Sequence, residues 1–239
     1  MKTMLKKAIH PIVLWLDSHG YSFSNFVRNS GWLKHRTIRQ VIQKTTMLSY
    51  PRVLGVLDAI DYIERNAIPG DIVVCGVWRG GLVGAICDYL LPSQGRTIWG
   101  YDTFEGNPEP DDRDGRQAKK IWHRGFLSVS EEQVRRNVGN RLNVRLVKGD
   151  ILNTIKTQKP EKIALMYLDT DWYASTKAEL DELYPLVSPG GVVFQDDFGL
   201  CPGAEQATED YFKDQPHKPL FVRLDVSARV WTKLAIMPQ

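Results

Sequence analysis

Short apolar runs alternate with helical patterns from residue 71 to residue 195, and this alternation restricts the fold more than any other feature of the sequence. Helical patterns occupy 82–91 and 176–186. The alternation predicts an α/β protein in which helices cover both faces of a parallel sheet. The runs are rich in β-branched and other apolar residues, and they are expected to be buried strands: 71–75, 97–101, 144–147, 163–168 and 191–195.

The end of the chain departs from this alternation. Two further apolar runs, 220–224 and 229–236, are joined by only a short polar turn. A parallel crossover needs about a dozen residues, so these two strands are expected to form an antiparallel hairpin. The prediction is therefore a mainly parallel sheet with one antiparallel terminal strand.

The residues before the sheet form a separate region. The pattern changes at Pro69-Gly70, and upstream of it apolar side chains recur at helical spacing. We expect a helical N-terminal extension over residues 1–66 and one catalytic domain over residues 67–239. The apolar stretch 12–16 is far shorter than the roughly 20 residues that span a bilayer. No signal-peptide cleavage site follows it, so a cytoplasmic chain without a membrane span is expected.

Charge and cysteine content narrow the class of partner. The chain has 31 basic and 28 acidic side chains, and a net charge of +3 gives no electrostatic reason to expect nucleic-acid binding. Its three cysteines are an odd set without metal-ligand spacing, which is typical of a reducing compartment. Partners must therefore be inferred from the residues that follow the predicted strands.

A glycine-rich turn, Gly76-Val77-Trp78-Arg79-Gly80-Gly81, follows the first predicted strand directly and opens a helix. Glycines let the backbone approach a ligand closely at the carboxyl edge of a parallel sheet, which is a cofactor-binding position. The turn lacks the full spacing of the dehydrogenase fingerprint, and many purely structural turns contain glycine. Alone, it only suggests a cofactor site.

Aspartates after the next two strands support that suggestion. Asp102 follows the second strand, where its carboxylate can accept hydrogen bonds from both hydroxyls of a ribose. Asp150 follows the third strand, where it could reach an adenine amino group. Each could instead be a helix N-cap or a turn aspartate, the commoner role of a single Asp in a loop. With the glycine-rich turn they predict a nucleoside site that suits methyl donors and nicotinamide cofactors equally.

Four carboxylates after the last two parallel strands distinguish these cofactors. Asp169 and Asp171 end the fourth strand, and Asp196 and Asp197 end the fifth. Neighbouring strands lie about 5 Å apart, so these carboxylates converge and repel one another unless they are protonated or neutralised by a hard divalent cation, above all Mg²⁺. A redox cofactor requires no such cluster. Capping by Asp196 and Asp197 is the alternative, but it leaves Asp169 and Asp171 unexplained.

These motifs, in this order, resemble the macrocin and mycinamicin type of sugar O-methyltransferases, a metal-dependent branch of the class I methyltransferases. The resemblance extends from about residue 46 to residue 233. One position departs from the family pattern, because Val74 stands where the family usually has an acidic residue. Besides the glycine-rich turn, the resemblance is carried by Asp102-Thr103-Phe104-Glu105-Gly106, Asp169-Thr170-Asp171-Trp172-Tyr173-Ala174-Ser175-Thr176, Tyr184-Pro185, Gly190-Gly191 and Asp196-Asp197.

The resemblance implies a Rossmann-like fold and an enzyme that transfers a methyl group from S-adenosylmethionine to a sugar hydroxyl of a glycosylated natural product or glycan. It also implies a homo-oligomer, either a dimer or a larger assembly. The implied ligands for Mg²⁺ are Asp169, Asp196 and Asp197. The implied donor site comprises Thr46, Met47, Gly76, Val77, Trp78, Arg79, Gly80, Gly81, Asp102, Thr103, Phe104, Gly149 and Asp150.

The acceptor side of the site is expected to involve residues 107–125. Their mixed charges and lack of an apolar period predict a mobile lid, in which His123 is either an acceptor contact or simply exposed. The metal is expected to lower the pKa of the acceptor hydroxyl, with Asp169 as the preferred base and Asp171 as the alternative.

Three other functions fit part of the sequence. A catechol-like phenol O-methyltransferase would use a similar metal beside a flat aromatic pocket. A nicotinamide-dependent sugar oxidoreductase or epimerase would share the nucleoside site but would not need the acidic cluster. A non-catalytic binding protein is suggested only by Val74.

Overall fold

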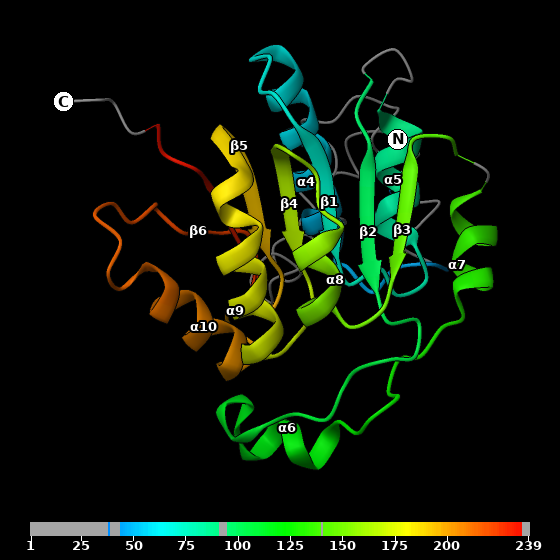
Figure 1. Cartoon of the computed structure of the whole chain (residues 1–239), viewed down its shortest axis with the longest axis vertical. Helices are drawn as coiled ribbons and strands as arrows, with labels where there is room; N and C mark the ends of the chain where they lie inside the picture. Colours follow the sequence, from blue (N-terminus) through cyan, green and yellow to red (C-terminus); the bar gives the residue numbers. More distant parts are fainter. Residues whose placement is uncertain (1–37, 39–43, 91–94, 140, 236–239) are drawn as a thin grey trace, which may run out of the picture.

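The computed structural model describes residues 38, 44–90, 95–139 and 141–235. The stretch 12–16 lies outside these residues, and the division into 1–66 and 67–239 stays a prediction. The described strands form one seven-stranded sheet in the order β3-β2-β1-β4-β5-β7-β6 (Figure 1). They are β1 (Asp71–Cys75), β2 (Ile98–Asp102), β3 (Val144–Lys148), β4 (Ile163–Leu168), β5 (Val187–Gln195), β6 (Val222–Arg223) and β7 (Arg229–Thr232).

Strand direction follows the prediction from the sequence. β1 to β5 are parallel to one another, whereas β7 pairs antiparallel with both β5 and β6. β6 and β7 form the predicted hairpin, because the turn between them is too short for a parallel crossover. The mainly parallel sheet with one reversed strand is thereby confirmed.

The strand bounds differ most from the prediction at β5. This strand begins at Val187 rather than at residue 191, and its pairing with β4 shifts register between Ile163 and Leu165. Gly190 has a positive φ of 78° within this stretch, so the extra length is an irregular lead-in to the strand. β6 and β7 are shorter than the runs 220–224 and 229–236 that predicted them.

Helices cover both faces of the sheet, as predicted (Figure 1). One layer holds α4 (Tyr50–Arg65), α5 (Gly81–Tyr89) and α7 (Glu131–Val138), and the other holds α8 (Ile151–Thr157), α9 (Tyr173–Glu182) and α10 (Pro202–Phe212). Strand side chains alternate between these layers. Val74 of β1 is fully buried with α4 and α5, whereas Val73 and Cys75 face the layer of α8 and α9.

α9 begins earlier and ends earlier than the helical pattern 176–186 indicates. It ends at Glu182 and is followed by a short 3₁₀ helix, η3 (Tyr184–Leu186). Pro185 lies in this segment. Because proline lacks a backbone N–H and clashes with the preceding turn, it cannot continue an α-helix.

Residues 107–125 lie beyond the carboxyl ends of the strands (Figure 1). They contain a 3₁₀ turn, η2 (Asp112–Asp114), and the short helix α6 (Gly115–Ile121), which the sequence pattern did not predict. These two elements contain only two buried residues, Asp114 and Ala118. They therefore have no apolar stripe from which the sequence pattern could have predicted a helix. Among the described residues, no helix is both long enough and apolar enough to cross a membrane.

Candidate functional site

A cavity of about 480 Å³ opens where the five parallel strands end. Each of these strand ends supplies one of the predicted site residues to its wall: Gly76 after β1, Asp102 of β2, Asp150 after β3, Asp169 after β4 and Asp196 after β5. The ends meet because β1 to β5 are parallel, so their carboxyl termini share one edge of the sheet.

Asp102 fixes the shape of the glycine-rich turn. Its Oδ2 accepts hydrogen bonds from the backbone N–H groups of Val77 (2.8 Å) and Trp78 (2.9 Å), and its Oδ1 accepts one from Phe104 (2.7 Å). A carboxylate has about four acceptor sites, so these three bonds leave one of them, on Oδ1, for a ribose hydroxyl. Asp102 therefore stabilises a turn, which is one of the two roles that the sequence left open. Its position at the cavity still allows the other role, binding of a nucleoside.

Gly81 lets the segment before α4 reach the cavity. Its N–H donates to the carbonyl oxygen of Thr45 (3.0 Å), and a Cβ on Gly81 would lie only 2.4 Å from that oxygen. Thr46 and Met47 consequently line the cavity, as the resemblance implied.

The other predicted donor residues divide into two groups. Val77, Trp78, Thr103, Gly149 and Asp150 line the cavity, and Asp150 also caps α8 by accepting from the N–H of Leu152 at 2.9 Å. Four predicted donor residues lie outside the lining and shape the turns around it: Arg79, Gly80, Gly81 and Phe104.

The acidic cluster follows from the register of three adjacent strands. The N–H of Asp169 donates to the carbonyl of Cys75, and the N–H of Asp196 donates to the carbonyl of Leu168, each at 2.9 Å. The backbone hydrogen bonding between the strands thus continues one residue beyond β4 and β5, and it holds Asp169 and Asp196 side by side. Carboxylate oxygens of Asp169, Asp196 and Asp197 lie within 4.8 Å of one another, so the predicted convergence is confirmed.

Burial and mutual repulsion make these carboxyls hard to ionise. Burial, followed by the charges of Asp196 and Asp197, raises the pKa of Asp169 well above its usual range. Burial, followed by the charges of Asp171 and Asp196, does the same to the pKa of Asp197. Burial raises the pKa of Asp196 to about 6. All three shifts favour the protonated carboxyl, and a bound cation would take the place of the protons.

Asp196 is held by two side chains that the sequence did not single out. The Tyr167 hydroxyl donates to its Oδ1, and Arg52 Nη1 donates to its Oδ2. Arg52 is in the first turn of α4, where a cation is unfavourable to the helix dipole. A basic residue at this unfavourable position is the signal in the sequence that could have indicated an acidic group close to Arg52.

Asp171 is positioned by residues 107–125 rather than by the sheet. Its backbone is left-handed, with φ of 65°, and its Oδ2 accepts a hydrogen bond from the Asn107 amide at 2.5 Å. Its Oδ1 lies 4.0 Å from the Cys201 thiol. Asp171 lines the cavity beside Asp169, so the structure brings both candidate bases to the same wall.

Residues 107–125 are joined to the loop after β4 at several points. The Trp172 indole N–H donates to the carbonyl of Pro108 (3.2 Å), and the N–H of Tyr173 donates to the buried carboxylate of Asp114 (2.7 Å). Trp122 lines the cavity, and its ring meets that of Trp172 edge to face with centroids 5.8 Å apart. The segment therefore covers the acidic cluster.

His123 takes no part in the lining. It is exposed, and its ring contacts Phe126 with centroids 5.7 Å apart. This placement favours the solvent-exposed alternative that the sequence left open. The neighbouring Trp122 does line the cavity, together with five other residues of this segment: Asn107, Pro108, Glu109, Asp111 and Asp114.

The comparison with known proteins agrees with this site. A sequence-family model, Macrocin-O-methyltransferase (TylF), matches residues 33–233. The chain belongs to this family. It is 35% identical over 175 residues to the demethyldecarbamoylnovobiocin O-methyltransferase of Streptomyces niveus, an alignment that covers 70% of this chain and 67% of that protein.

Two further similarities support the assignment to the TylF family. Over 176 residues the chain is 32% identical to the 8-demethyl-8-(2,3-dimethoxy-alpha-L-rhamnosyl)-tetracenomycin-C 4'-O-methyltransferase of Streptomyces olivaceus, with coverage of 70% of this chain and 67% of that protein. The solved structure of the O-methyltransferase NovP superposes with a TM-score of 0.74 at 30% identity, covering 80% of this chain and 83% of that one.

This TylF-family protein is an S-adenosylmethionine-dependent O-methyltransferase with the class I methyltransferase fold. The family and the fold class predicted from the sequence are confirmed. Because the chain belongs to this family, we reject two of the alternative functions: a nicotinamide-dependent oxidoreductase and a non-catalytic binding protein. The roles of individual site residues, the acceptor and the metal belong to the proposal that follows.

Proposed function

We propose that this methyltransferase acts on a sugar hydroxyl of a glycosylated natural product and uses a divalent cation, preferably Mg²⁺, held by Asp169, Asp196 and Asp197. The observation that carries the proposal is the group of three carboxylates whose oxygens lie within 4.8 Å of one another in the wall of the cavity. The name of the tetracenomycin relative, a 4'-O-methyltransferase for a rhamnosyl compound, supports a sugar acceptor.

The chemistry of these residues fits a hard cation. Carboxylate oxygens are the ligands that Mg²⁺ prefers in proteins. Asp197 is buried, and its Oδ2 has no hydrogen-bond partner among the residues that the structure describes. A buried oxygen without a partner costs free energy, which a bound cation would offset. Both oxygens of Asp196 already accept a hydrogen bond, so it would contribute a remaining lone pair while Asp169 and Asp197 supply freer oxygens.

A divalent cation, when bound, would act as a Lewis acid that lowers the pKa of an acceptor hydroxyl. Asp169 is the base that we prefer, because it lines the cavity at the end of β4. Asp171 is less suited to this role, because the Asn107 amide and the Cys201 thiol engage its two oxygens.

The rest of the cavity would hold the two substrates. The glycine-rich turn, shaped by Asp102, would hold the donor on one side, together with Thr46, Met47 and Asp150. Trp122 and Trp172 would hold the acceptor on the other side, and aromatic faces of this kind suit the apolar face of a sugar ring. Residues 107–125 would exclude water while the methyl group and the acceptor oxygen are held in line.

The test of metal dependence is methyl transfer with and without chelator, followed by addition of Mg²⁺. Asp197→Asn is expected to abolish turnover while calorimetry shows unchanged donor affinity. Asp181→Asn is the matched control, because Asp181 is a half-exposed carboxylate on α9 that pairs with Lys177 away from the cavity. Full activity in excess chelator would reject the metal. A panel of glycosylated acceptors against catechols tests the acceptor class, and a preference for catechols would reject a sugar.

A further inference from the structure

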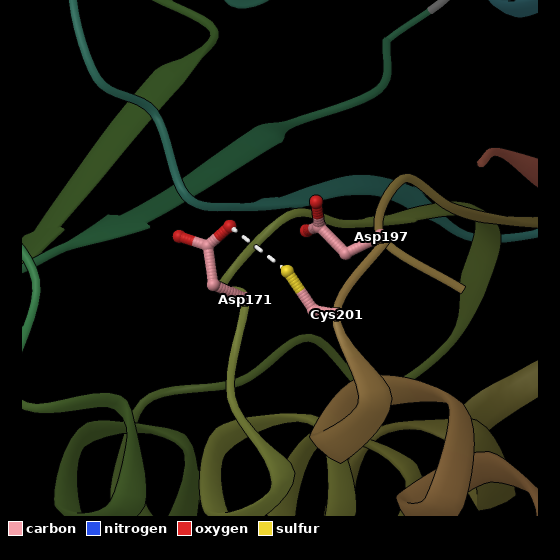
Figure 2. A group of neighbouring side chains, drawn as sticks. All are labelled: Asp171, Asp197 and Cys201. Carbon is pink, nitrogen blue, oxygen red and sulfur yellow. Dashed lines mark hydrogen bonds between the residues drawn. The ribbon is translucent and has the colours of Figure 1, made fainter. Parts of the chain in front are cut away.

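A second group of side chains lies beside the proposed Mg²⁺ ligands and includes a thiol. Asp171, Asp197 and Cys201 place two carboxylate oxygens and one sulfur within 4.8 Å of one another (Figure 2). Asp171 reaches in from the loop after β4, whereas Asp197 and Cys201 come from the turn that leads into α10 (Figure 2). The proposed function uses Asp197 and has no role for Cys201.

The backbone holds Cys201 in this position. Its N–H donates to the carbonyl of Asp197 at 2.9 Å, which closes one helical turn. Residues four apart on such a turn face the same side, so the thiol and the Asp197 carboxylate point into a common space. The thiol is buried and its Sγ lies 4.0 Å from Asp171 Oδ1.

One carboxylate oxygen of this group is buried without a partner in the described part of the chain. Asp197 Oδ2 is buried, the residue is only 5% exposed, and no hydrogen-bond donor among the described residues reaches this oxygen. A carboxylate has two oxygens and can contact two neighbouring positions at once. Asp197 belongs both to this group and to the group of Asp169 and Asp196, so its carboxylate can contact both positions.

We propose that Asp171, Asp197 and Cys201 form a second cation position, which prefers borderline and soft divalent ions such as Zn²⁺ and Cd²⁺ and inhibits the enzyme when it is filled. Thiolate sulfur selects softer cations than the oxygen ligands of the first position do. Zn²⁺ accepts one cysteine sulfur, aspartate oxygens and a water molecule in a tetrahedral site. Binding would release the thiol proton to solvent and leave a thiolate on the cation.

Inhibition follows because the two positions share Asp197. A soft cation would draw this carboxylate away from the Mg²⁺ position, so raising the Mg²⁺ concentration is expected to relieve the inhibition. The binding of a soft cation does not depend on the proposed function, whereas the competition with Mg²⁺ rests on it. Cation binding to the thiol can be measured in the absence of donor and acceptor.

The experiment is a Cd²⁺ titration of the chelator-treated full chain, followed by the ultraviolet absorption of the thiolate-to-cadmium bond. The wild-type chain is expected to show this band, and Cys201→Ser and Cys201→Ala are expected to lose it. Cys87→Ser is the matched control, because Cys87 is another buried thiol but lies on α5, where it packs in the core. This control is expected to keep the band.

A second measurement uses the enzyme reaction. The Zn²⁺ concentration that halves methyl transfer is expected to rise at least about tenfold in Cys201→Ser, while Cys87→Ser matches the wild type. Should the Cys201 variants not fold, Asp171→Asn keeps the thiol and is expected to weaken Cd²⁺ binding. A wild-type chain without the band, or a band that Cys201→Ser retains, would overturn the proposal. A band in an enzyme that needs no Mg²⁺ would support this site and reject the proposed function.

Discussion

The guanidinium group of Arg52 donates a hydrogen bond to Asp196, which carries one of the carboxylates proposed to bind Mg²⁺. Its Nε donates to Asp225 (2.7 Å) and its Nη2 to Asp225 (3.2 Å) and Ser227 (2.5 Å). Arg52 thus joins the start of α4 to the acidic cluster and to the turn between β6 and β7. Because an arginine stays charged in proteins, it offsets part of the repulsion among the carboxylates when no cation is present.

Replacing this guanidinium should destabilise the chain most when metal is absent. Arg52→Ala is expected to lower the free energy of unfolding by about 3 kcal/mol in chelator, because it leaves the buried Asp196 without its cation. Added Mg²⁺ is expected to restore part of the loss, since a ligand that binds only the folded state stabilises it. Urea unfolding with and without Mg²⁺ measures both effects.

The control for Arg52 is Arg136→Ala. Arg136 pairs with Glu132 on the exposed face of α7, where an ion pair contributes less than about 1 kcal/mol. Equal losses of stability in the two variants would contradict the role assigned to Arg52.

A second prediction concerns pH and Glu179, which is fully buried on α9 below the acidic loop. The Thr170 hydroxyl donates to its Oε1 at 2.8 Å, and its Oε2 has no partner among the described residues. Burial raises the pKa of Glu179 from 4.5 to about 8. Between these pH values the folded chain holds a proton that the unfolded chain has lost. The stability that Glu179 contributes is therefore complete below about pH 4.5 and falls as the pH rises towards 8.

Glu179→Gln keeps the shape of the side chain and cannot ionise. Its free energy of unfolding is expected to exceed that of the wild type at pH 9 by a difference on the order of a few kcal/mol, and to match it near pH 4.5. Urea unfolding across this range in chelator measures the difference. Glu182→Gln on the same helix is the control, because its partly exposed ion pair with Lys159 lowers the pKa of Glu182. A gain at high pH in Glu182→Gln, or none in Glu179→Gln, would count against burial as the cause.

The sequence predicted the parts of the site that follow directly from strands. Asp169 and Asp196 come immediately after apolar runs that form β4 and β5, so the parallel register alone brings them together. Asp102 was located in the same way, although its hydrogen bonds to the backbone of Val77 and Trp78 were not. Local pattern and strand order suffice for such residues.

The parts that the sequence missed depend on packing between distant segments. Arg52 reaches Asp196 only because α4 packs against β4 and β5, across a sequence separation of 144 residues. The position of Trp122 depends on how residues 107–125 fold over the strand ends. Cys201 meets Asp171 through a turn that no apolar period marks. Propensity and periodicity carry no information about such contacts.

A third prediction concerns the close approach of Gly76 to Asp169. Gly76 has φ of +84°, and a Cβ there would lie 1.9 Å from the carbonyl oxygen of Asp169. Gly76→Ala must therefore move either the glycine-rich turn or the proposed base. A displacement of about 1 Å at reacting groups costs on the order of 100-fold in rate, so we expect kcat/KM to fall at least about that far.

Gly84→Ala is the control for Gly76. Gly84 lies within α5, and a Cβ there would meet nothing within 4 Å. This variant is expected to keep full activity and to gain roughly 0.5–1 kcal/mol in stability, because alanine favours a helix over glycine. A wild-type value of kcat/KM in Gly76→Ala would contradict the prediction, because it would show that the glycine-rich turn and Asp169 can move apart without loss of activity.

The last prediction assigns Trp122 to the acceptor rather than to the donor. Its ring lines the cavity and packs edge to face on Trp172 and on Phe126, whose ring centroid lies 4.8 Å away. Trp122→Ala is expected to raise the acceptor KM about fivefold, because stacking of a ring on an aromatic side chain contributes on the order of 1 kcal/mol. Donor affinity, measured by calorimetry, is expected to stay unchanged. Ile121→Ala, a neighbouring exposed residue outside the lining, should alter neither quantity. Weaker donor binding with an unchanged acceptor KM would contradict the prediction and would assign Trp122 to the donor.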